Sequence, residues 1–412
     1  MSEYVIIGGG IAGLAAAKRI SEADYGKQIT LISLSGEKTK SKPGLMYSLP
    51  GEVDIAQLQR LPDDFYVQNN LNILSKKVHR IDPINRQVVF ADNTTMHYGK
   101  LLLAYGNAPI LPEVGGGENK NVFSLARTSD FVRMQRALPK VEQAVVVGAG
   151  KSGLEVASML ARQGTHVVVI EKTNDLLDGA VPKDLSNMLF TELRKNNVQI
   201  VLKEEVIHCG GSDGKVSYVE TAGSRRYEAQ LVVFCCGSKP DMRLIEKTKI
   251  RHHHGILVDA QMRTSVDDIW AAGAVVEIED ERKNARMMLP FWSEGQQMGR
   301  IAGSNMAGKN AHFDPGAVII SSLIAGKQFH AVGELFPDNT REKHTIIDQE
   351  NRLRGEFIRL VLKDDILVGA CWYGAGPNPF TLKQIIDSES PVPREKKILL
   401  DPRFRWEHCI RI

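Results

Sequence analysis

Short apolar runs recur along the chain, and two of them precede glycine-rich turns and helix-like stretches. The first run, Tyr4 to Ile7, leads into glycines and then into the stretch Leu14 to Ile20. The second run, Ala144 to Val147, leads into glycines and then into the stretch Leu154 to Arg162. A short continuous apolar run bounded by turn residues is typical of a buried strand in a parallel sheet. The pattern therefore predicts two strand–turn–helix units in an α/β fold.

The rest of the pattern predicts further strands and helices, and a different architecture near the C-terminus. Apolar runs predict strands over 28–33, 94–103, 166–170 and 231–236, and helix-like stretches span 123–138 and 185–196. The segment 264–273 is expected to return to the first domain. From about Gly308, short strands alternate with polar turns. The runs 357–362 and 366–372 flank a polar turn, which predicts a β-hairpin.

Both glycine-rich turns have the spacing G-x-G-x-x-G. Their glycines are Gly8, Gly10 and Gly13 in the first turn, and Gly148, Gly150 and Gly153 in the second. When a strand precedes such a turn and a helix follows it, the N–H groups of the helix N-terminus point at a pyrophosphate. Two such units predict two bound dinucleotides, and two dinucleotides indicate electron transfer between them.

An acidic residue follows the second turn at the end of its next predicted strand. Glu171 can accept both hydroxyls of an adenosine ribose and would repel a 2′-phosphate, so NADH is favoured over NADPH. The neighbouring Lys172 weakens this preference only slightly. The alternative is a solvated charge at a strand end. The triplet Gly150-Lys151-Ser152 also occurs in P-loops, but that motif needs a glycine at Val145, so an ATPase is disfavoured.

The composition indicates an ordinary soluble protein. A net charge of +3 gives no reason to expect nucleic acid or an anionic membrane as a partner. No apolar run approaches the ~20 residues of a membrane span. No signal peptide is expected, and the cysteines form no C-x-x-C pair, so a reducing cytoplasm is expected. The run His252 to His254 fits a solvated turn better than a metal site, because three adjacent histidines cannot all face one ion.

Several longer segments complete the pattern when they are taken in order. After the first turn come Leu101-Leu102-Leu103-Ala104-Tyr105-Gly106, Ser124-Leu125-Ala126-Arg127-Thr128, Gly153-Leu154-Glu155 and Ile269-Trp270-Ala271-Ala272-Gly273. The chain resembles the FAD- and NAD(P)H-dependent pyridine nucleotide oxidoreductases, which are glutathione-reductase-like flavoproteins. Later segments are similar to the rubredoxin reductase and NADH-dependent nitrite reductase branch: Pro290-Phe291-Trp292-Ser293, Gly295-Gln296-Gln297-Met298-Gly299, Asn305-Met306-Ala307-Gly308 and Leu367-Val368-Gly369-Ala370.

This resemblance implies two Rossmann-like dinucleotide-binding domains, the second inserted in the first, and a C-terminal α+β interface domain. The FAD-binding domain would comprise 1–111 and 241–307, the NAD(P)H-binding domain 112–240, and the C-terminal domain 308–412. A Pro/Gly-rich link that starts at Pro112 agrees with the first boundary. A homodimer is a further expectation from the same family.

The resemblance also implies the residues of both sites. FAD would contact Gly8, Gly10, Ala12, Gly13, Ser33, Lys42, Val78, Ala104, Tyr105, Gly106, Arg127, Gly273, Ala274 and Trp292. NADH would contact Gly148, Gly150, Lys151, Ser152, Gly153, Glu171, Lys172 and Gly237. The candidate catalytic residues are Glu155, beside the nicotinamide, and Lys42, beside the flavin. The simpler alternatives are a helix-dipole carboxylate for Glu155, a surface position for Lys42 and a core aromatic for Trp292.

The first site departs from the family pattern at three positions. Ser33 stands where many relatives have a ribose-binding acid, Tyr105 replaces a threonine, and Ala274 replaces an aspartate that holds a ribityl hydroxyl. FAD would then be loosely held, held by substitute contacts, or replaced by another ligand. In the second site, Lys151 replaces an aromatic residue that shields the flavin in many relatives.

The disulfide chemistry of many relatives is missing. No cysteine precedes Cys209, and Gly44 stands near the position of a redox-active cysteine in the coenzyme A disulfide reductases. We therefore expect hydride transfer from NADH to FAD and electron release to a small electron-carrier protein such as rubredoxin. The alternatives are a reductase of a quinone or small organic acceptor, and a scaffold subunit that has lost tight flavin binding.

Overall fold

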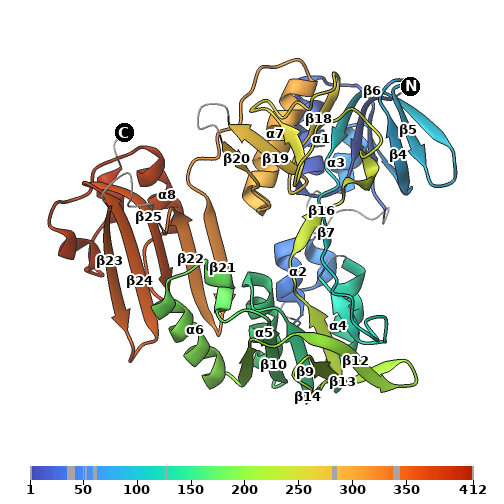
Figure 1. Ribbon diagram of the computed structural model, residues 1–412. Coiled ribbons are helices and arrows are strands. Elements are labelled where there is room, and N and C mark those ends of the chain that lie inside the picture. The colour runs from blue at the N-terminus through green and yellow to red at the C-terminus, as the bar shows by residue number, and fades with distance from the viewer. Residues whose placement is uncertain are drawn as a thin grey trace. The chain divides into compact units, whose positions relative to one another are not determined.

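The computed structural model describes residues 2–34, 42–49, 51, 53–58, 63–125, 128–280, 285–336 and 344–410. The chain forms two compact units (Figure 1). Unit 1 comprises Met1–Leu45, Val53–Ile110 and Ser238–Asp314, and unit 2 comprises Met46–Glu52, Leu111–Gly237 and Pro315–Ile412. The predicted middle and C-terminal domains thus belong to one compact unit. The four-part domain division remains a prediction.

Unit 1 is built on a mostly parallel sheet with the strand order β3-β2-β1-β6-β5-β4, and β18 pairs with β6. Its strands are β1 (Ser2–Ile7), β2 (Ile29–Ile32), β3 (Leu71–Leu74), β4 (Val78–Asp82), β5 (Gln87–Phe90), β6 (Thr95–Leu103) and β18 (Ile269–Ala271). The central strand β1 pairs in parallel with both β2 and β6. The pairing of β18 with Leu101 to Leu103 confirms that the segment 264–273 returns to the first domain.

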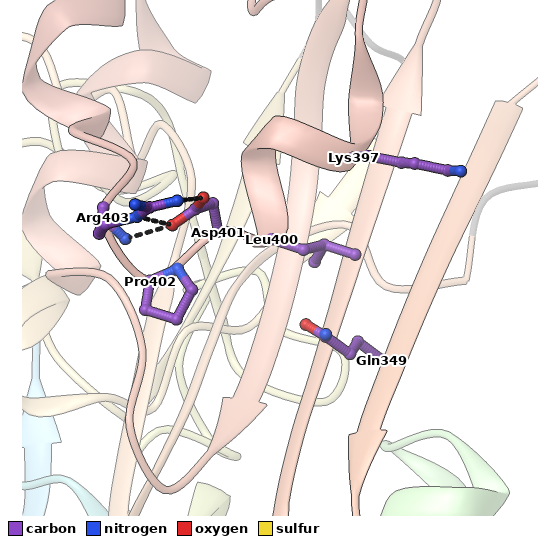
Figure 2. Close-up of a pocket in the computed structure, with 6 residues that line it drawn as sticks. All are labelled: Gln349, Lys397, Leu400, Asp401, Pro402 and Arg403. Atoms are coloured by element: carbon purple, nitrogen blue, oxygen red, sulfur yellow. Dashed lines mark hydrogen bonds and ion pairs between the residues drawn. The ribbon is translucent and has the colours of Figure 1, made fainter.

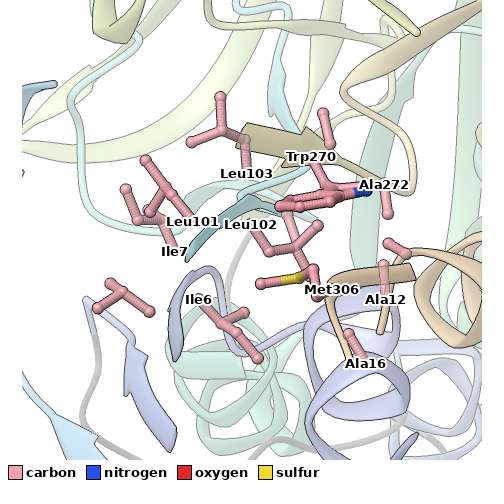
Figure 3. Packing of buried hydrophobic residues seen from close by; sticks show 14 of the residues in the cluster. Ile6, Ile7, Ala12, Ala16, Leu101, Leu102, Leu103, Trp270, Ala272 and Met306 are labelled. Atoms are coloured by element: carbon pink, nitrogen blue, oxygen red, sulfur yellow. The ribbon is translucent and has the colours of Figure 1, made fainter. Parts of the chain in front are cut away.

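Two helices pack together on this sheet, α1 (Ile11–Ala23) and α7 (Trp292–Met306). Figure 3 shows Ala12 and Ala16 of α1 beside Met306 of α7, with strand residues such as Ile6 and Leu102. Glycine is required at 303, because a Cβ there would lie 2.6 Å from the carbonyl oxygen of Ala16. The other elements are α2 (Lys42–Ser48), η1 (Ile55–Leu58), α3 (Asp63–Gln68), β7 (Asn107–Pro109), β16 (Ser238–Pro240), η4 (Met242–Leu244), β17 (Ile256–Val258), β19 (Val276–Asp280) and β20 (Ala285–Met287).

The first part of unit 2 contains a second parallel sheet, with the order β11-β10-β9-β15-β8. Its strands are β8 (Val122–Ser124), β9 (Gln143–Val147), β10 (His166–Glu171), β11 (Val198–Leu202) and β15 (Leu231–Phe234). Its helices are α4 (Thr128–Ala137), η2 (Leu138–Lys140), α5 (Lys151–Arg162), η3 (Leu176–Gly179) and α6 (Lys183–Lys195). A small antiparallel sheet contains β12 (Val206–Ser212), β13 (Lys215–Thr221) and β14 (Arg226–Glu228).

Two boundaries in this part were predicted wrongly. The helix expected over 123–138 begins only at Thr128, because Phe123 lies in the short edge strand β8 that pairs with β15. The strand expected over 231–236 ends at Phe234, so Cys235 and Cys236 follow the strand and are half-buried.

The second part of unit 2 is an antiparallel sheet with the order β21-β22-β25-β24-β23. Its elements are β21 (Ile319–Ile324), β22 (Lys327–Gly333), β23 (His344–Asn351), β24 (Glu356–Lys363), β25 (Ile366–Tyr373), α8 (Pro379–Asp387), η5 (Lys396–Leu400) and η6 (Trp406–Cys409). The predicted hairpin is confirmed as β24 and β25, and its turn includes Asp364 with φ +53°. Among the helices of the described residues, none combines the length and the apolar character that a membrane crossing needs.

Candidate functional site: two glycine turns

The first glycine turn connects β1 to α1 with a conformation that only glycine fits at two positions. Gly8 has φ +115°, and a Cβ on Gly13 would overlap the carbonyl oxygen of Gly8. A Cβ on Gly10 would meet no atom within 4 Å, so this position borders open space. Helix α1 has no side-chain cap and no acidic residue in its first turn. The turn therefore presents backbone N–H groups and a positive helix end to a ligand, which fits a pyrophosphate.

Several predicted FAD residues converge on this turn at the carboxyl ends of the parallel strands. The N–H of Gly8 donates to the carbonyl of Ile32, the residue before Ser33, at 2.9 Å. The N–H of Ala104 donates to the carbonyl of Ile7 at 2.8 Å. A Cβ on Gly273 would lie 3.0 Å from the Cβ of Ala12. Ligands of doubly wound folds bind at this edge, where neighbouring strands lead to opposite sides of the sheet.

Tyr105 follows β6 and carries an unsatisfied polar atom. Its hydroxyl is buried and has no hydrogen-bond partner among the described residues. Burial raises the pKa of this hydroxyl far above its ordinary value, and the charge of Asp241 adds to the rise. An unsatisfied buried hydroxyl costs about 1–3 kcal/mol, so a ligand that accepts its hydrogen bond would gain by binding here. This orphan hydroxyl supports the fit of the first site to a cofactor with acceptor atoms.

The other residues predicted to contact FAD belong to several different elements and turns. Gly106 has φ +71° between β6 and β7, and Ala274 follows Gly273 in the turn after β18. Trp292 begins α7 and is half-buried. Val78 begins β4, which β5 and β6 separate from β1. Lys42 begins α2, but its side chain lies outside the described part of the chain, as does the whole of Arg127.

The second glycine turn connects β9 to α5 and repeats the geometry of the first. Gly148 has φ +106°, and a Cβ on Gly153 would overlap the carbonyl oxygen of Gly148. A Cβ on Gly150 would meet nothing within 4 Å. Helix α5 also has no side-chain cap and no acidic residue in its first turn. This turn therefore fits a second pyrophosphate by the same physical criteria.

Glu171 is held against the second turn by backbone donors. Its Oε2 accepts a hydrogen bond from the N–H of Ala149 at 2.7 Å, and its Oε1 accepts one from Thr173 at 2.9 Å. A carboxylate has about four acceptor sites, so two remain for the hydroxyls of a ribose. Lys172 beside it is exposed, and Gly237, with φ +88°, is exposed after β15. The position and free acceptor capacity of Glu171 agree with the predicted ribose contact.

Glu155 lies in the first turns of α5, the helix that begins at the second glycine turn. The Nζ of Lys151 lies 3.2 Å from its Oε1 and 3.3 Å from its Oε2. The hydroxyl of Ser322 on β21 donates to the same Oε1 at 2.7 Å. The Glu155 side chain keeps 14% of its surface exposed, whereas Ser152 on the same helical turn is largely exposed. Ser322 was missed by the sequence analysis, because 167 residues separate it from Glu155 and no motif contains it.

The cysteines and histidines form no second reactive centre in the described residues. All five cysteines are free thiols, and burial raises the pKa of Cys235 far above its ordinary value. No group of three or more His, Cys, Asp and Glu side chains that could hold a metal ion is found in the described part of the chain. Within the histidine run, Nδ1 of His253 lies 3.2 Å from the buried carboxylate of Glu277.

A surface pocket of about 640 Å³ lies in the C-terminal part of unit 2 (Figure 2). It is lined by Gln349, Lys397, Leu400, Asp401, Pro402 and Arg403. Arg403 donates to both carboxylate oxygens of Asp401, at 3.1 and 2.8 Å, so this pair is already neutralised. The two turns therefore remain the better candidate sites.

Comparison with known proteins yields one family and several relatives. The family model described as pyridine nucleotide-disulphide oxidoreductase matches residues 2–299. The NAD(P)H sulfur oxidoreductase (CoA-dependent) of Pyrococcus abyssi is 30% identical over 321 residues, which are 76% of this chain and 71% of the relative. The nitrite reductase [NAD(P)H] of Bacillus subtilis is 25% identical over 405 residues, which are 97% of this chain and 49% of that protein.

Solved structures share the fold over nearly the whole chain. The ferredoxin reductase for the CYP199A2 system from Rhodopseudomonas palustris has a TM-score of 0.89 and 20% identity, with 100% of both chains covered. The reductase in the covalent putidaredoxin reductase–putidaredoxin complex has a TM-score of 0.88 and 22% identity, with 99% of this chain and 98% of that chain covered. These likenesses confirm the predicted α/β fold class with Rossmann-like domains.

Proposed function

The chain belongs to the pyridine nucleotide-disulphide oxidoreductases and is a flavin- and NAD(P)H-dependent oxidoreductase, and we propose that it uses FAD and NADH to reduce a small electron-carrier protein. The proposed reaction takes one NADH and two oxidised one-electron carriers to NAD⁺, one proton and two reduced carriers. Bound flavin would supply the conversion between the two-electron hydride donor and the one-electron acceptor, which no amino-acid side chain performs.

The observation that carries this proposal is the pair of glycine turns with the same backbone geometry. Each turn ends at an uncapped helix N-terminus, and each has a middle glycine that borders open space. We assign FAD to the first turn, where Gly8, Gly13 and Tyr105 would contact it. We assign NADH to the second turn, where Gly148, Gly153 and Glu171 would contact it.

The preference for NADH over NADPH rests on the charge of Glu171. Both of its oxygens already accept backbone N–H groups, so the side chain cannot turn away without leaving those donors unpaired. A 2′-phosphate placed at this position would face the fixed carboxylate. Lys172 beside it offers a partial counter-charge, so NADPH should reduce the flavin more slowly than NADH.

A one-electron carrier is favoured as the acceptor over a thiol or disulfide relay. All five cysteines of the chain lie in the ranges of unit 2, so unit 1 contains none. Cys235 lies against the second turn, but the rise of its pKa by burial disfavours the thiolate that such a relay needs. Electrons that leave the flavin would therefore pass directly to an external acceptor, such as a rubredoxin-like or iron–sulfur protein.

The second candidate function is that of a scaffold subunit whose flavin binding is weakened. Ser33 and Ala274 stand where an acid would otherwise bind the cofactor, and neither side chain carries a charge. Losing two charged hydrogen bonds would cost ~3–6 kcal/mol of affinity. Such a loss of affinity would favour a protein that binds a nucleotide and partner proteins without catalysing a reaction.

One experiment separates the candidates. The purified protein, incubated with FAD and freed of excess by gel filtration, is mixed with NADH without oxygen, and absorbance is followed near 450 nm. We expect yellow protein whose absorbance bleaches, and reoxidation by added rubredoxin or ferredoxin at two carriers per NADH. A protein that retains no FAD and oxidises no NADH would support the scaffold, whereas reoxidation by a quinone alone would assign the small-molecule acceptor.

A further inference from the structure

A hairpin of the C-terminal sheet contacts the helix that starts at the second glycine turn. Strand β21 packs against α5, and β22 follows it after a tight turn (Figure 1). Ser322 on β21 is only 4% exposed. Its hydroxyl donates to Oε1 of Glu155 at 2.7 Å. The C-terminal sheet thus supplies a donor to a carboxylate on the nucleotide-binding helix.

Two further polar contacts fix the hairpin against the helices α5 and α6. The N–H of Ala325, in the hairpin turn, donates to the hydroxyl of Ser158 at 2.9 Å. The Nζ of Lys327, at the start of β22, donates to Oε2 of the buried Glu192 on α6 at 2.9 Å. Because the hairpin is anchored on both helices, the position of Ser322 is set by the fold and not by Glu155 alone.

The donors around Glu155 leave its two oxygens unequal. Among the described residues, Oε1 accepts hydrogen bonds from Ser322 and Lys151, whereas Oε2 accepts one from Lys151 alone, at the longer distance of 3.3 Å. A glutamate side chain that is not held loses rotamer freedom when it binds a ligand. A side chain that two donors already fix has lost most of that freedom beforehand. Oε2 is therefore a pre-oriented acceptor with spare capacity.

Glu155 and Glu171 belong to different elements of the same strand–turn–helix–strand unit. Glu171 ends β10 and is held by the turn itself, whereas Glu155 lies within α5 and is held from β21. If Glu171 binds the adenosine ribose, the other end of the dinucleotide must lie away from it. The carboxamide of a nicotinamide has an NH₂ group that can donate to a carboxylate oxygen such as Oε2.

We propose that Ser322 is a positioning residue that fixes Glu155 for the carboxamide of NADH, so that the C-terminal domain completes the nicotinamide end of the second site. This inference rests on the proposed function, because it requires NADH at the second turn. Ser322 acts through Glu155 and itself touches no substrate.

The test replaces Ser322 by alanine in the full-length protein loaded with FAD. We expect the rate constant of flavin reduction at saturating NADH to fall about 10-fold, the effect of losing a hydrogen bond of ~1.5 kcal/mol to a charged group. Calorimetric titration of the flavin-free protein with NADH should show a weaker dissociation constant by a similar factor. Ser322→Thr, which keeps the hydroxyl, should restore both values to within about 3-fold of the wild type.

Two control variants separate positioning from general loosening. Ser321→Ala removes the neighbouring hydroxyl, which is exposed and bonds to His330 at 2.8 Å, and should change neither readout. Ser158→Ala releases the hairpin turn without touching Glu155 and should change thermal stability more than NADH binding. In a Glu155→Gln background, Ser322→Ala should have no further effect beyond about 2-fold, because the two residues act as one unit.

The inference is overturned if Ser322→Ala binds NADH and is reduced like the wild type. It is also overturned if Ser158→Ala reproduces the full loss, or if Ser322→Ala retains its whole effect in the Glu155→Gln background. Failure of the proposed function gives a different result, since the wild-type protein itself would then bind no NADH. If the alanine variant does not fold, the serine-to-threonine comparison and the Glu155→Gln titration still decide the outcome.

Discussion

The second glycine turn allows a paired substitution that separates folding from binding. A Cβ on Gly150 would meet no atom within 4 Å, and this residue has φ −70° and ψ 178°, which any residue adopts. A Cβ on Gly153 would lie 3.0 Å from the carbonyl carbon of Gly148 and closer still to its oxygen. Gly150→Ala should therefore fold and lose nucleotide affinity, whereas Gly153→Ala should lose stability.

The magnitudes follow from what each new methyl group meets. At Gly153 the two nearest atoms are the carbonyl oxygen and carbon of Gly148, which are backbone atoms, so no side-chain rotation relieves the overlap. Overpacking of a core costs about 1–3 kcal/mol or more, and we expect the upper end, which corresponds to a fall in Tm of roughly 6–12 °C. At Gly150, alanine reduces the entropy of the unfolded chain by about 0.4–1 kcal/mol but is a poorer helix N-cap by a similar amount. The net effect on Tm should be within about 3 °C.

The assay combines thermal unfolding by circular dichroism with NADH titration of the flavin-free protein. Gly150→Ala should weaken NADH binding at least 10-fold, because its methyl group occupies the space in which a phosphate would approach the backbone. Gly10→Ala, its counterpart in the first turn, serves as a matched control that should leave NADH affinity unchanged. The reasoning is refuted if Gly150→Ala lowers Tm as much as Gly153→Ala does, or binds NADH like the wild type.

Three further substitutions test the charges and the orphan hydroxyl. Glu171→Gln should raise the kcat/KM ratio of NADPH to NADH about 10-fold in stopped-flow reduction, and an unchanged ratio would contradict the ribose assignment. Tyr105→Phe removes an unsatisfied buried hydroxyl, so the flavin-free protein should be as stable as the wild type or up to ~1–2 kcal/mol more stable in urea unfolding. The same substitution should weaken FAD binding. A destabilised protein would show that the hydroxyl has a partner. Burial alone would raise the pKa of Glu192, but hydrogen bonds from Lys195 and Lys327 outweigh burial and lower it. The ionised carboxylate therefore stabilises the folded protein above its ordinary pKa of 4.5, and this stabilisation is lost as pH falls through the lower pKa of the folded state. Lys327→Met should therefore destabilise unit 2 by ~1–3 kcal/mol at pH 7, with a gap to the wild type that narrows toward pH 3 in urea unfolding; a gap that is constant with pH would refute this linkage.

The parallel-sheet units were predictable because their signals are local in the sequence. The runs before each turn became β1 and β9, and the glycine spacing predicted where α1 and α5 begin. The short strand β8 was missed, because three residues carry too little periodicity and Phe123 is held by pairing with β15. The extent of β15 was overestimated for a related reason. Cys235 and Cys236 are apolar in the sequence, but the chain leaves the sheet there so that a backbone carbonyl can approach Gly148.

The candidate site was predictable only where a single βαβ unit contains both the motif and the residue that contacts it. Glu171 ends the strand after the second turn, and its contact with Ala149 lies within one βαβ unit. Ser322 reaches Glu155 from a different sheet, and nothing in the neighbouring sequence of either residue indicates the contact. The burial of the Tyr105 hydroxyl was also invisible, because a polar group at a strand end is usually solvated. Long-range contacts of this kind depend on how domains pack, which a pattern of single residues does not encode.

The two turns have the same backbone but unequal side-chain support, and this inequality has a consequence for the cofactors. At the second turn, Glu171 adds a charged acceptor to the N–H groups of the helix end. At the first turn, Ser33 and Ala274 add no charge, and the hydroxyl of Tyr105 offers one neutral hydrogen bond worth about 0.5–1.5 kcal/mol. That single bond cannot offset the ~3–6 kcal/mol that two charged contacts would contribute. A nanomolar flavin site weakened by this difference would have a dissociation constant of about 10 nM to about 10 μM, so we expect part of the FAD to dissociate on gel filtration and added FAD to restore the yellow colour.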